Sequence, residues 1–372
     1  MEVNPMKKLS LFVILCLVVG LLAGCAGTPV IYYSDCTCPP AAHEAAPTQP
    51  AETEAPAETE APVLSEGALK TGLFISTSIR DSKSATAEEA GEAKYDVTIV
   101  AVLVDDEGII RDCIIDGIAA SVNFDAAGTV TTDLTQALAT KNELGENYGM
   151  VAWGGAVAEW DAQAAAVAAA CVGQHYGSLQ GVVVAESGYA PEGTDLATSA
   201  TIYIGGYVKA VELAAATAQH LGAQTGDTLK LAVNTGIGSS VSATEEKEGT
   251  AQLDVDAAVV TLNGDVISSC AIDSVQAKVN FDLSGVVTTD VNTTPSTKNQ
   301  LGEQYGMVAW GGAIAEWNVQ AASFASYVTG KTAAEVAGIA VNEGTKPTEA
   351  DLATSVTIAI GGFQALIAKA CK

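Results

Sequence analysis

The sequence predicts an α+β fold that is built twice, as two tandem homologous domains, each an antiparallel sheet with two or three packed helices. The first observation behind this prediction is an internal repeat: residues 140–160 return as residues 297–317 with three changes in 21 positions, at an offset of 157. Solenoid and propeller repeats are far shorter, so the repeated unit is a whole domain. The second observation is that strand-like alternation comes first in each copy and helix-like periodicity follows.

The first half of each copy is predicted to form the sheet. An extended run opens each copy, at residues 71–79 and 230–237, and a hairpin follows it. In the second copy the hairpin turns at Asn263 and Gly264, which is a strong signal for a tight turn. Four shorter runs are expected to continue the two sheets: residues 122–125, 129–133, 279–282 and 286–290.

The second half of each copy is predicted to be mainly helical. From Trp160 and from Trp317, residues that suit a buried face recur every three or four positions. Thr332 and Glu335 have the spacing of a capping box, which indicates a short helix.

The last part of each copy is predicted from a strand-like run and an amphipathic pattern. Residues 182–185 and 338–341 are candidates for one more strand. After them, one amphipathic helix is expected to start at Asp195 in the first copy and at Asp351 in the second, and to pack on the sheet.

The first 25 residues are predicted to be a lipoprotein signal peptide. Lys7 and Lys8 precede an apolar run, residues 9–22, that is short for a stable membrane span. The run ends in Leu-Ala-Gly-Cys, residues 22–25, which resembles the lipobox of bacterial lipoproteins. The resemblance implies that Cys25 is lipidated and holds the protein on the extracytoplasmic side of a cell membrane, in a bacterium of the Gram-positive type. The alternative is an ordinary signal or an uncleaved membrane helix with a chance cysteine.

Residues 26–66 are predicted to be a disordered tether. Between residues 39 and 62 almost every residue is Ala, Pro, Glu or Thr. Such a segment has few large apolar side chains to bury, and its carboxylates repel one another. The two predicted domains therefore occupy residues 67–222 and 223–372.

The charge of the chain excludes several classes of partner. The formal net charge is −27, and the only arginines are Arg80 and Arg111. Nucleic acid is excluded because phosphate contacts need clustered Lys and Arg side chains. The same charge opposes docking onto anionic lipid, so the lipid anchor is expected to make the membrane contact.

Catalytic and metal chemistry are not predicted. The second copy contains no histidine, so neither a Ser-His-Asp arrangement nor a histidine-ligated metal is the shared function. Cys113 and Cys270 are equivalent and lie in strand-like runs, where buried thiols are expected. Cys36 and Cys38 lack a partner pair, so no zinc site is predicted. A binding protein or an electron carrier is favoured over an enzyme, and no catalytic residue is assigned.

The duplicated segment is the first candidate site. It combines a cation, an amide, flat rings and glycines, which suits a planar and partly anionic ligand. The competing interpretation is structural, with Tyr and Trp filling the core and Gly making turns. Trp160 and Trp317 are assigned to the helix core and not to the site. The candidate ligand residues are Lys141, Asn142, Tyr148 and Trp153, with their equivalents Lys298, Asn299, Tyr305 and Trp310.

The second candidate site is the sequence Asp-Leu-Ala-Thr-Ser-Ala-Thr at residues 195–201, which returns with one change at residues 351–357. It resembles the Asp-x-x-Ser-Gly-Ala-Thr motif of the extracytoplasmic FMN-binding domain, found in the Rnf electron-transport complex and in tandem-domain flavin lipoproteins of Gram-positive bacteria. In that family the last threonine carries FMN through its phosphate. The resemblance implies a cofactor-binding set: Asp195, Thr198, Thr201, Asp351, Thr354 and Thr357.

Two functions follow from these observations. The first is a membrane-anchored electron carrier, in which FMN supplies the chemistry and electrons come from a membrane redox partner. The second is a cofactor-free surface lipoprotein that binds a small molecule, a wall component or a protein partner. The order of elements and the anchor favour the carrier. Ser199 and Ser355 replace the glycine of the family motif, and this departure favours the cofactor-free binding lipoprotein.

Overall fold

The computed structural model describes residues 67–372. The predicted signal peptide, the lipidation site at Cys25 and the tether lie outside the described residues. Within the described part of the chain, no helix has the length and apolar character needed to cross a membrane.

Each repeat contains one three-stranded antiparallel sheet with its strands in chain order. The opening strands and the hairpins are where the sequence predicts them. The strands are β1 (Lys70–Ser78), β2 (Gly91–Val104) and β3 (Ile110–Phe124) in the first repeat, and β4 (Thr228–Gly236), β5 (Gly249–Asn263) and β6 (Val266–Phe281) in the second.

The predicted extensions at residues 129–133 and 286–290 are not strands. Each forms a single bridge, Phe124 with Val130 and Phe281 with Val287. The reason is that the chain turns toward the other repeat at this point: the backbone N–H of Val130 donates to the Ser242 hydroxyl, at 2.9 Å.

The two sheets pack face to face and share one hydrophobic core, to which all six strands contribute. The rings of Phe124 and Phe281, at the ends of β3 and β6, stack within this core, with centroids 3.9 Å apart. Gly91 lies against the Phe124 ring, where an added Cβ would come within 2.2 Å of it. Reciprocal backbone bonds of 2.8 Å, from Ala85 to Gly285 and from Ala243 to Gly128, join the loops of the two repeats. The repeats therefore form one pseudo-symmetric unit.

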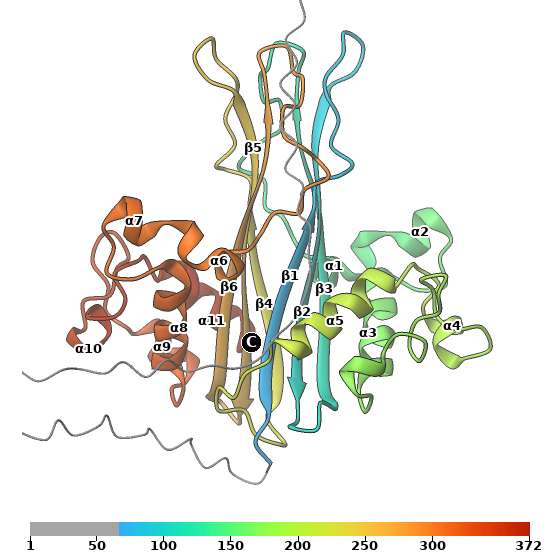
Figure 1. The fold of residues 1–372 in the computed structure, drawn as a ribbon, viewed down its shortest axis with the longest axis vertical. Helices are drawn as coiled ribbons and strands as arrows, with labels where there is room; N and C mark the ends of the chain where they lie inside the picture. Colours follow the sequence, from blue (N-terminus) through green and yellow to red (C-terminus); the bar gives the residue numbers. More distant parts are fainter. Residues whose placement is uncertain (1–66) are drawn as a thin grey trace, which may run out of the picture. The chain divides into compact units, whose positions relative to one another are not determined.

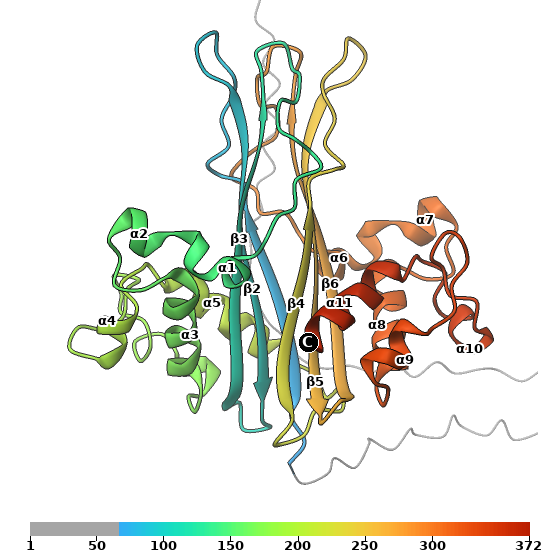
Figure 2. The same ribbon diagram turned by 180° about the vertical axis from the view of Figure 1, so that it is seen from behind.

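Helices cover the outer face of each sheet, so the layers run helix, sheet, sheet, helix (Figures 1 and 2). The main helices are α3 (Trp160–Cys171) and α5 (Gly205–Ala216) on the first sheet, and α8 (Trp317–Val328), α9 (Ala333–Ala337) and α11 (Gly361–Ala370) on the second. Thr332 caps α9 through the predicted capping box with Glu335.

Short helical turns make up the duplicated segment and the motif region. In the first repeat they are α1 (Lys141–Leu144), η1 (Gly145–Tyr148), α2 (Met150–Gly154), η2 (Tyr176–Ser178) and α4 (Asp195–Ser199). In the second they are α6 (Lys298–Leu301), η3 (Gly302–Tyr305), α7 (Met307–Gly311) and α10 (Ala350–Ala353).

Two predictions for the last part of each repeat are wrong. The single helix expected from Asp195 is two helices, α4 and α5, and the helix expected from Asp351 is likewise α10 and α11. The candidate strands at residues 182–185 and 338–341 form only isolated bridges. A buried glutamine in each repeat explains its helix break, as described below. Cys113 and Cys270 are buried free thiols, as predicted.

Candidate functional site

A buried aspartate anchors the start of each duplicated segment to the edge strand of its sheet. Asp116 on β3 accepts backbone N–H bonds from Gly117, at 2.7 Å, and from Asn142, at 3.1 Å. The Asn142 side chain donates to the carbonyl of Ile115, at 3.0 Å. Asp273 and Asn299 make the same contacts in the second repeat. The two asparagines predicted to bind a ligand therefore hold the segment to the sheet.

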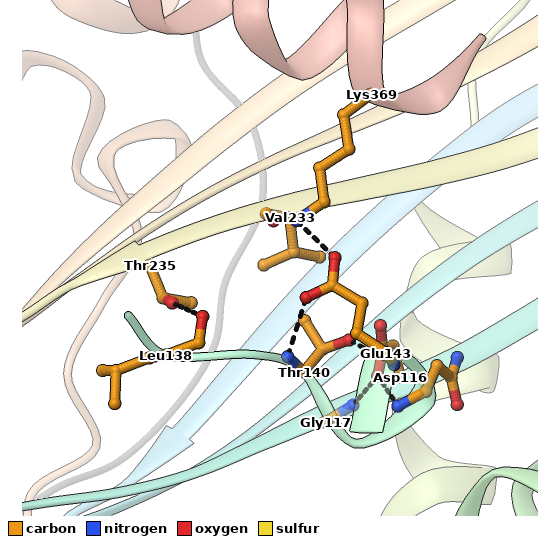
Figure 3. Close-up of polar contacts among 9 residues, drawn as sticks. Asp116, Gly117, Leu138, Thr140, Glu143, Val233, Thr235 and Lys369 are labelled. Atoms are coloured by element: carbon orange, nitrogen blue, oxygen red, sulfur yellow. Dashed lines mark hydrogen bonds and ion pairs between the residues drawn. The ribbon is translucent and has the colours of Figure 1, made fainter. Parts of the chain in front are cut away.

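The first segment is also tied to the second repeat. Thr140 caps α1, and Glu143 completes its capping box. Lys369, on α11, bonds both the Glu143 carboxylate and the carbonyl of Val233 (Figure 3). In the second segment the residue equivalent to Glu143 is Gln300, which has no charge to offer a lysine. The two segments are thus alike in backbone but differ in how they are secured.

The predicted ligand lysines and tyrosines pack against the core tryptophans. The Lys141 ammonium lies 4.9 Å from the centroid of the Trp160 ring and 5.6 Å from that of Tyr148. It also approaches the carboxylate of Asp96, at 3.5 Å. The same cluster recurs in the second repeat with Lys298, Tyr305 and Trp317. Cation–π contacts of this kind stabilise the fold, so these side chains are engaged within it.

The two lysines differ in electrostatic setting. Burial is the largest influence on both, and it lowers the pKa of Lys298. Around Lys141, the neighbouring Tyr207, Asp96 and Tyr148 outweigh burial, so the pKa of Lys141 is raised instead. Both cations are enclosed by rings and carboxylates rather than displayed to solvent.

Trp153 and Trp310 stand out in the predicted ligand set because their rings are almost fully exposed to solvent. Trp153, on α2, is 90% exposed, and Trp310, on α7, is 86% exposed. Trp160 and Trp317 are buried, as predicted. We call residues 149–157 and 306–314 the tryptophan loops. Their exposed aliphatic side chains are Val151, Val157, Val308 and Ile314.

Each tryptophan loop is held in shape from below. The Glu159 carboxylate accepts the backbone N–H groups of Met150, at 2.8 Å, and Val151, at 3.0 Å, which fixes the first turn of α2. The Trp153 ring covers Gly149, where the backbone has a φ of +82° and an added Cβ would come within 2.3 Å of the ring. Glu316 holds α7 in the same way. The sequence analysis did not single out either glutamate, although Glu159 directly precedes Trp160 and Glu316 directly precedes Trp317.

A buried glutamine holds the helix break that contains Thr201. The side-chain oxygen of Gln163 accepts the backbone N–H groups of Thr201, at 2.9 Å, and Ile202, at 3.3 Å, and lies 3.4 Å from the Thr201 hydroxyl. Gln320 makes the equivalent contacts with Thr357 and Ile358. These residues cannot continue the helix, because their N–H groups bond a side chain from another element.

The residues of the motif fit a flavin phosphate poorly. An attached phosphate would need N–H donors beside Thr201 and Thr357, and the glutamines already occupy them. The hydroxyls of Thr198 and Thr354 donate to the backbone carbonyls of Asp195 and Asp351. Both aspartates are exposed, so their carboxylates would repel a phosphate.

Helix α3 links the two candidate sites of the first repeat. Its first residue, Trp160, packs on Lys141, and Gln163, one turn later, holds Thr201. In the described range, no group of three or more His, Cys, Asp or Glu side chains is placed to hold a metal ion. Comparisons of the chain with protein-family models, with curated proteins and with solved structures found no match.

Proposed function

We propose that the protein is a membrane-anchored extracytoplasmic lipoprotein that binds a partner through its two tryptophan loops. One observation carries the proposal: Trp153 and Trp310 are almost fully exposed in both repeats. The other side chains of the predicted ligand set make contacts that stabilise the fold. Large exposed apolar side chains next to further aliphatic ones mark interaction sites in soluble proteins.

The energetics favour binding at two sites together. A tryptophan side chain buries roughly 200 Å² on docking, which is worth about 5 kcal/mol at 25 cal/mol per Å². Lost rotational and translational freedom offsets most of this gain, so one loop alone binds weakly. Two loops on one chain bind a repeated or paired target much more tightly, because the second contact forms within the complex.

The proposal is tested by retention on the cell surface. The full chain, the double variant Trp153→Ser/Trp310→Ser and the control Tyr189→Ser are each incubated with surface material of the producing bacterium and sedimented. Tyr189 is an exposed aromatic residue outside the loops. We expect the wild type and the control to be retained and the double variant to stay in solution. Equal retention of all three would overturn the proposal.

An FMN electron carrier is the second candidate function. One observation favours it: Thr201 is exposed between α4 and α5 and is open to attachment. The occupied donors around Thr201 count against it. The test is the visible absorbance of the full chain after co-expression with a flavin transferase, followed by fluorescence on a denaturing gel. A coloured protein whose fluorescence disappears in Thr201→Ala and Thr357→Ala would establish the carrier.

A further inference from the structure

The tryptophan loops are apolar at the tip and acidic at the base. Beside the exposed ring of Trp153 lie aliphatic side chains and two glycines, Gly154 and Gly155. Of the glutamates near the loops, Glu143 pairs with Lys369, and Glu159 and Glu316 accept backbone N–H groups of α2 and α7. Glu146 and Glu303 are exposed. Each loop therefore presents an apolar knob with negative charge at its rim.

This chemistry limits what the loops can bind. A polyanionic wall polymer or an anionic membrane is repelled by the rim and by the net charge of −27. A neutral glycan stacks on tryptophan, but the other exposed side chains within each tryptophan loop are aliphatic, and the exposed glutamate comes three residues before the loop. A protein surface with an apolar patch buries the knob, and Lys or Arg around that patch complements the glutamates.

We infer that each tryptophan loop docks on a protein surface whose apolar patch is rimmed by lysine or arginine, and that one chain engages two such surfaces at once. The inference rests on the proposed function. Tryptophan is among the residues that most often dominate binding at protein interfaces. The second half of the inference follows from the arrangement in Figures 1 and 2, where α2 and α7 lie on opposite sides of the two-sheet core.

The opposite placement of the loops means that a single small surface does not reach both. The nine residues of each loop differ only at Val157 and Ile314, so both loops suit the same target. A partner present in two copies, or one with repeated patches, is therefore the natural target, and its binding strengthens through avidity.

The test uses two synthetic helical peptides as probes. Both have a leucine face; one carries lysine at its edges and the other glutamate. Binding to the full chain is followed by titration calorimetry and by tryptophan fluorescence. We expect two lysine peptides per wild-type chain, one per chain for Trp153→Ser or Trp310→Ser, and none for the double variant. The glutamate peptide is expected to bind at least about tenfold more weakly, equivalent to about 1.4 kcal/mol.

A matched pair of variants tests the rim. In Glu146→Gln/Glu303→Gln, lysine-peptide binding is expected to weaken and to lose most of its salt dependence. In Glu343→Gln, which removes an exposed glutamate outside the loops, binding is expected to stay at the wild-type level. Equal binding of both peptides, or failure of the lysine peptide to bind, would contradict the inference.

Two further probes separate the inference from the proposed function. Soluble wall-glycan fragments and phosphatidylcholine vesicles are titrated in the same assay. If either binds in a tryptophan-dependent way and the lysine peptide does not, the partner class is wrong, but the loops still bind. If surface material also fails to retain the wild-type chain, the proposed function fails as well.

Discussion

Buried polar side chains shape both repeats at the scale of single residues. Asp116 accepts the N–H of its neighbour Gly117 and that of Asn142 from a different segment. Gln163 accepts two N–H groups from a different segment, those of Thr201 and Ile202. Asp273 and Gln320 do the same in the second repeat. A buried acceptor of this kind specifies one backbone path, because a misplaced chain leaves the acceptor and its donors unpaired. These buried residues therefore fix the backbone on either side of each tryptophan loop.

Replacing the buried glutamine should destabilise the fold strongly. In Gln163→Leu the part-buried N–H groups of Thr201 and Ile202 lose their acceptor, which costs up to about 1–3 kcal/mol for each group that water does not reach. We expect the free energy of unfolding in urea to fall by about 3 kcal/mol. Thr201→Val, which removes only the 3.4 Å hydroxyl contact, is the control and should change it by less than about 1 kcal/mol. A Gln163→Leu protein as stable as wild type would contradict this role.

The buried aspartates should make stability depend on pH. Burial raises the pKa of Asp273 above its ordinary value, although the bonds to Thr297, Asn299 and Ser274 oppose the rise. The stabilising contribution of such a group is complete below its unfolded pKa of about 4 and is lost as pH rises through the raised folded pKa. Asn does not ionise, so in Asp273→Asn stability is not lost in this way as the pH rises. We expect the variant to gain stability relative to wild type between pH 4 and 7, measured by urea unfolding. A relative loss over that range would mean that the folded pKa is lowered.

Removing the Tyr95 hydroxyl should stabilise the fold, in contrast to replacing Gln163. Its ring is buried between the sheets, and within the described residues its hydroxyl finds no hydrogen-bond partner. An unpaired buried hydroxyl costs roughly 1–3 kcal/mol. Tyr95→Phe keeps the ring and removes the hydroxyl, so we expect the free energy of unfolding to rise by about 1 kcal/mol in a urea titration. A fall of similar size would show that the hydroxyl has a partner, such as a buried water.

The helix break shows what the sequence could and could not predict at the scale of elements. Strand alternation and the Asn263–Gly264 turn are local signals, and both hairpins follow them. The break after α10 has no local signal, because Leu352, Val356 and Ile360 keep the helical spacing through it. Its cause is Gln320, on a different helix, and a contact between distant segments is invisible to periodicity. Display of Trp153 was likewise beyond prediction, since a tryptophan in an apolar segment is more often buried.

The base of the first duplicated segment should depend on a residue near the C-terminus. Lys369→Met removes the partner of Glu143, which lies in α1. We expect faster amide hydrogen exchange across residues 140–148 by mass spectrometry. Residues 297–305, where Gln300 replaces the glutamate, serve as the internal control and should exchange at the wild-type rate. Equal acceleration of exchange in both segments would point to a general loss of stability. No acceleration would show that the ion pair between Lys369 and Glu143 does not secure residues 140–148.

At the scale of the whole described unit, the core shared by the two sheets joins the repeats that carry the two tryptophan loops. The Phe124–Phe281 stack and the reciprocal loop bonds join the repeats, so both tryptophan loops belong to one packed unit. The sequence contains a signal of this packing: β2 ends in an unbroken apolar run, Val100–Val104, and such a run indicates a strand covered on both faces. Helices on one face and the other repeat on the second provide that cover.

The most direct test of the central claim is the affinity of single-loop variants for cell-surface material. Bivalent docking predicts that Trp153→Ser and Trp310→Ser each weaken apparent binding by a similar factor, at least about tenfold, because each loses avidity. The double variant should lose binding while keeping the wild-type unfolding midpoint, since both side chains are exposed. Full affinity in the double variant would contradict the account.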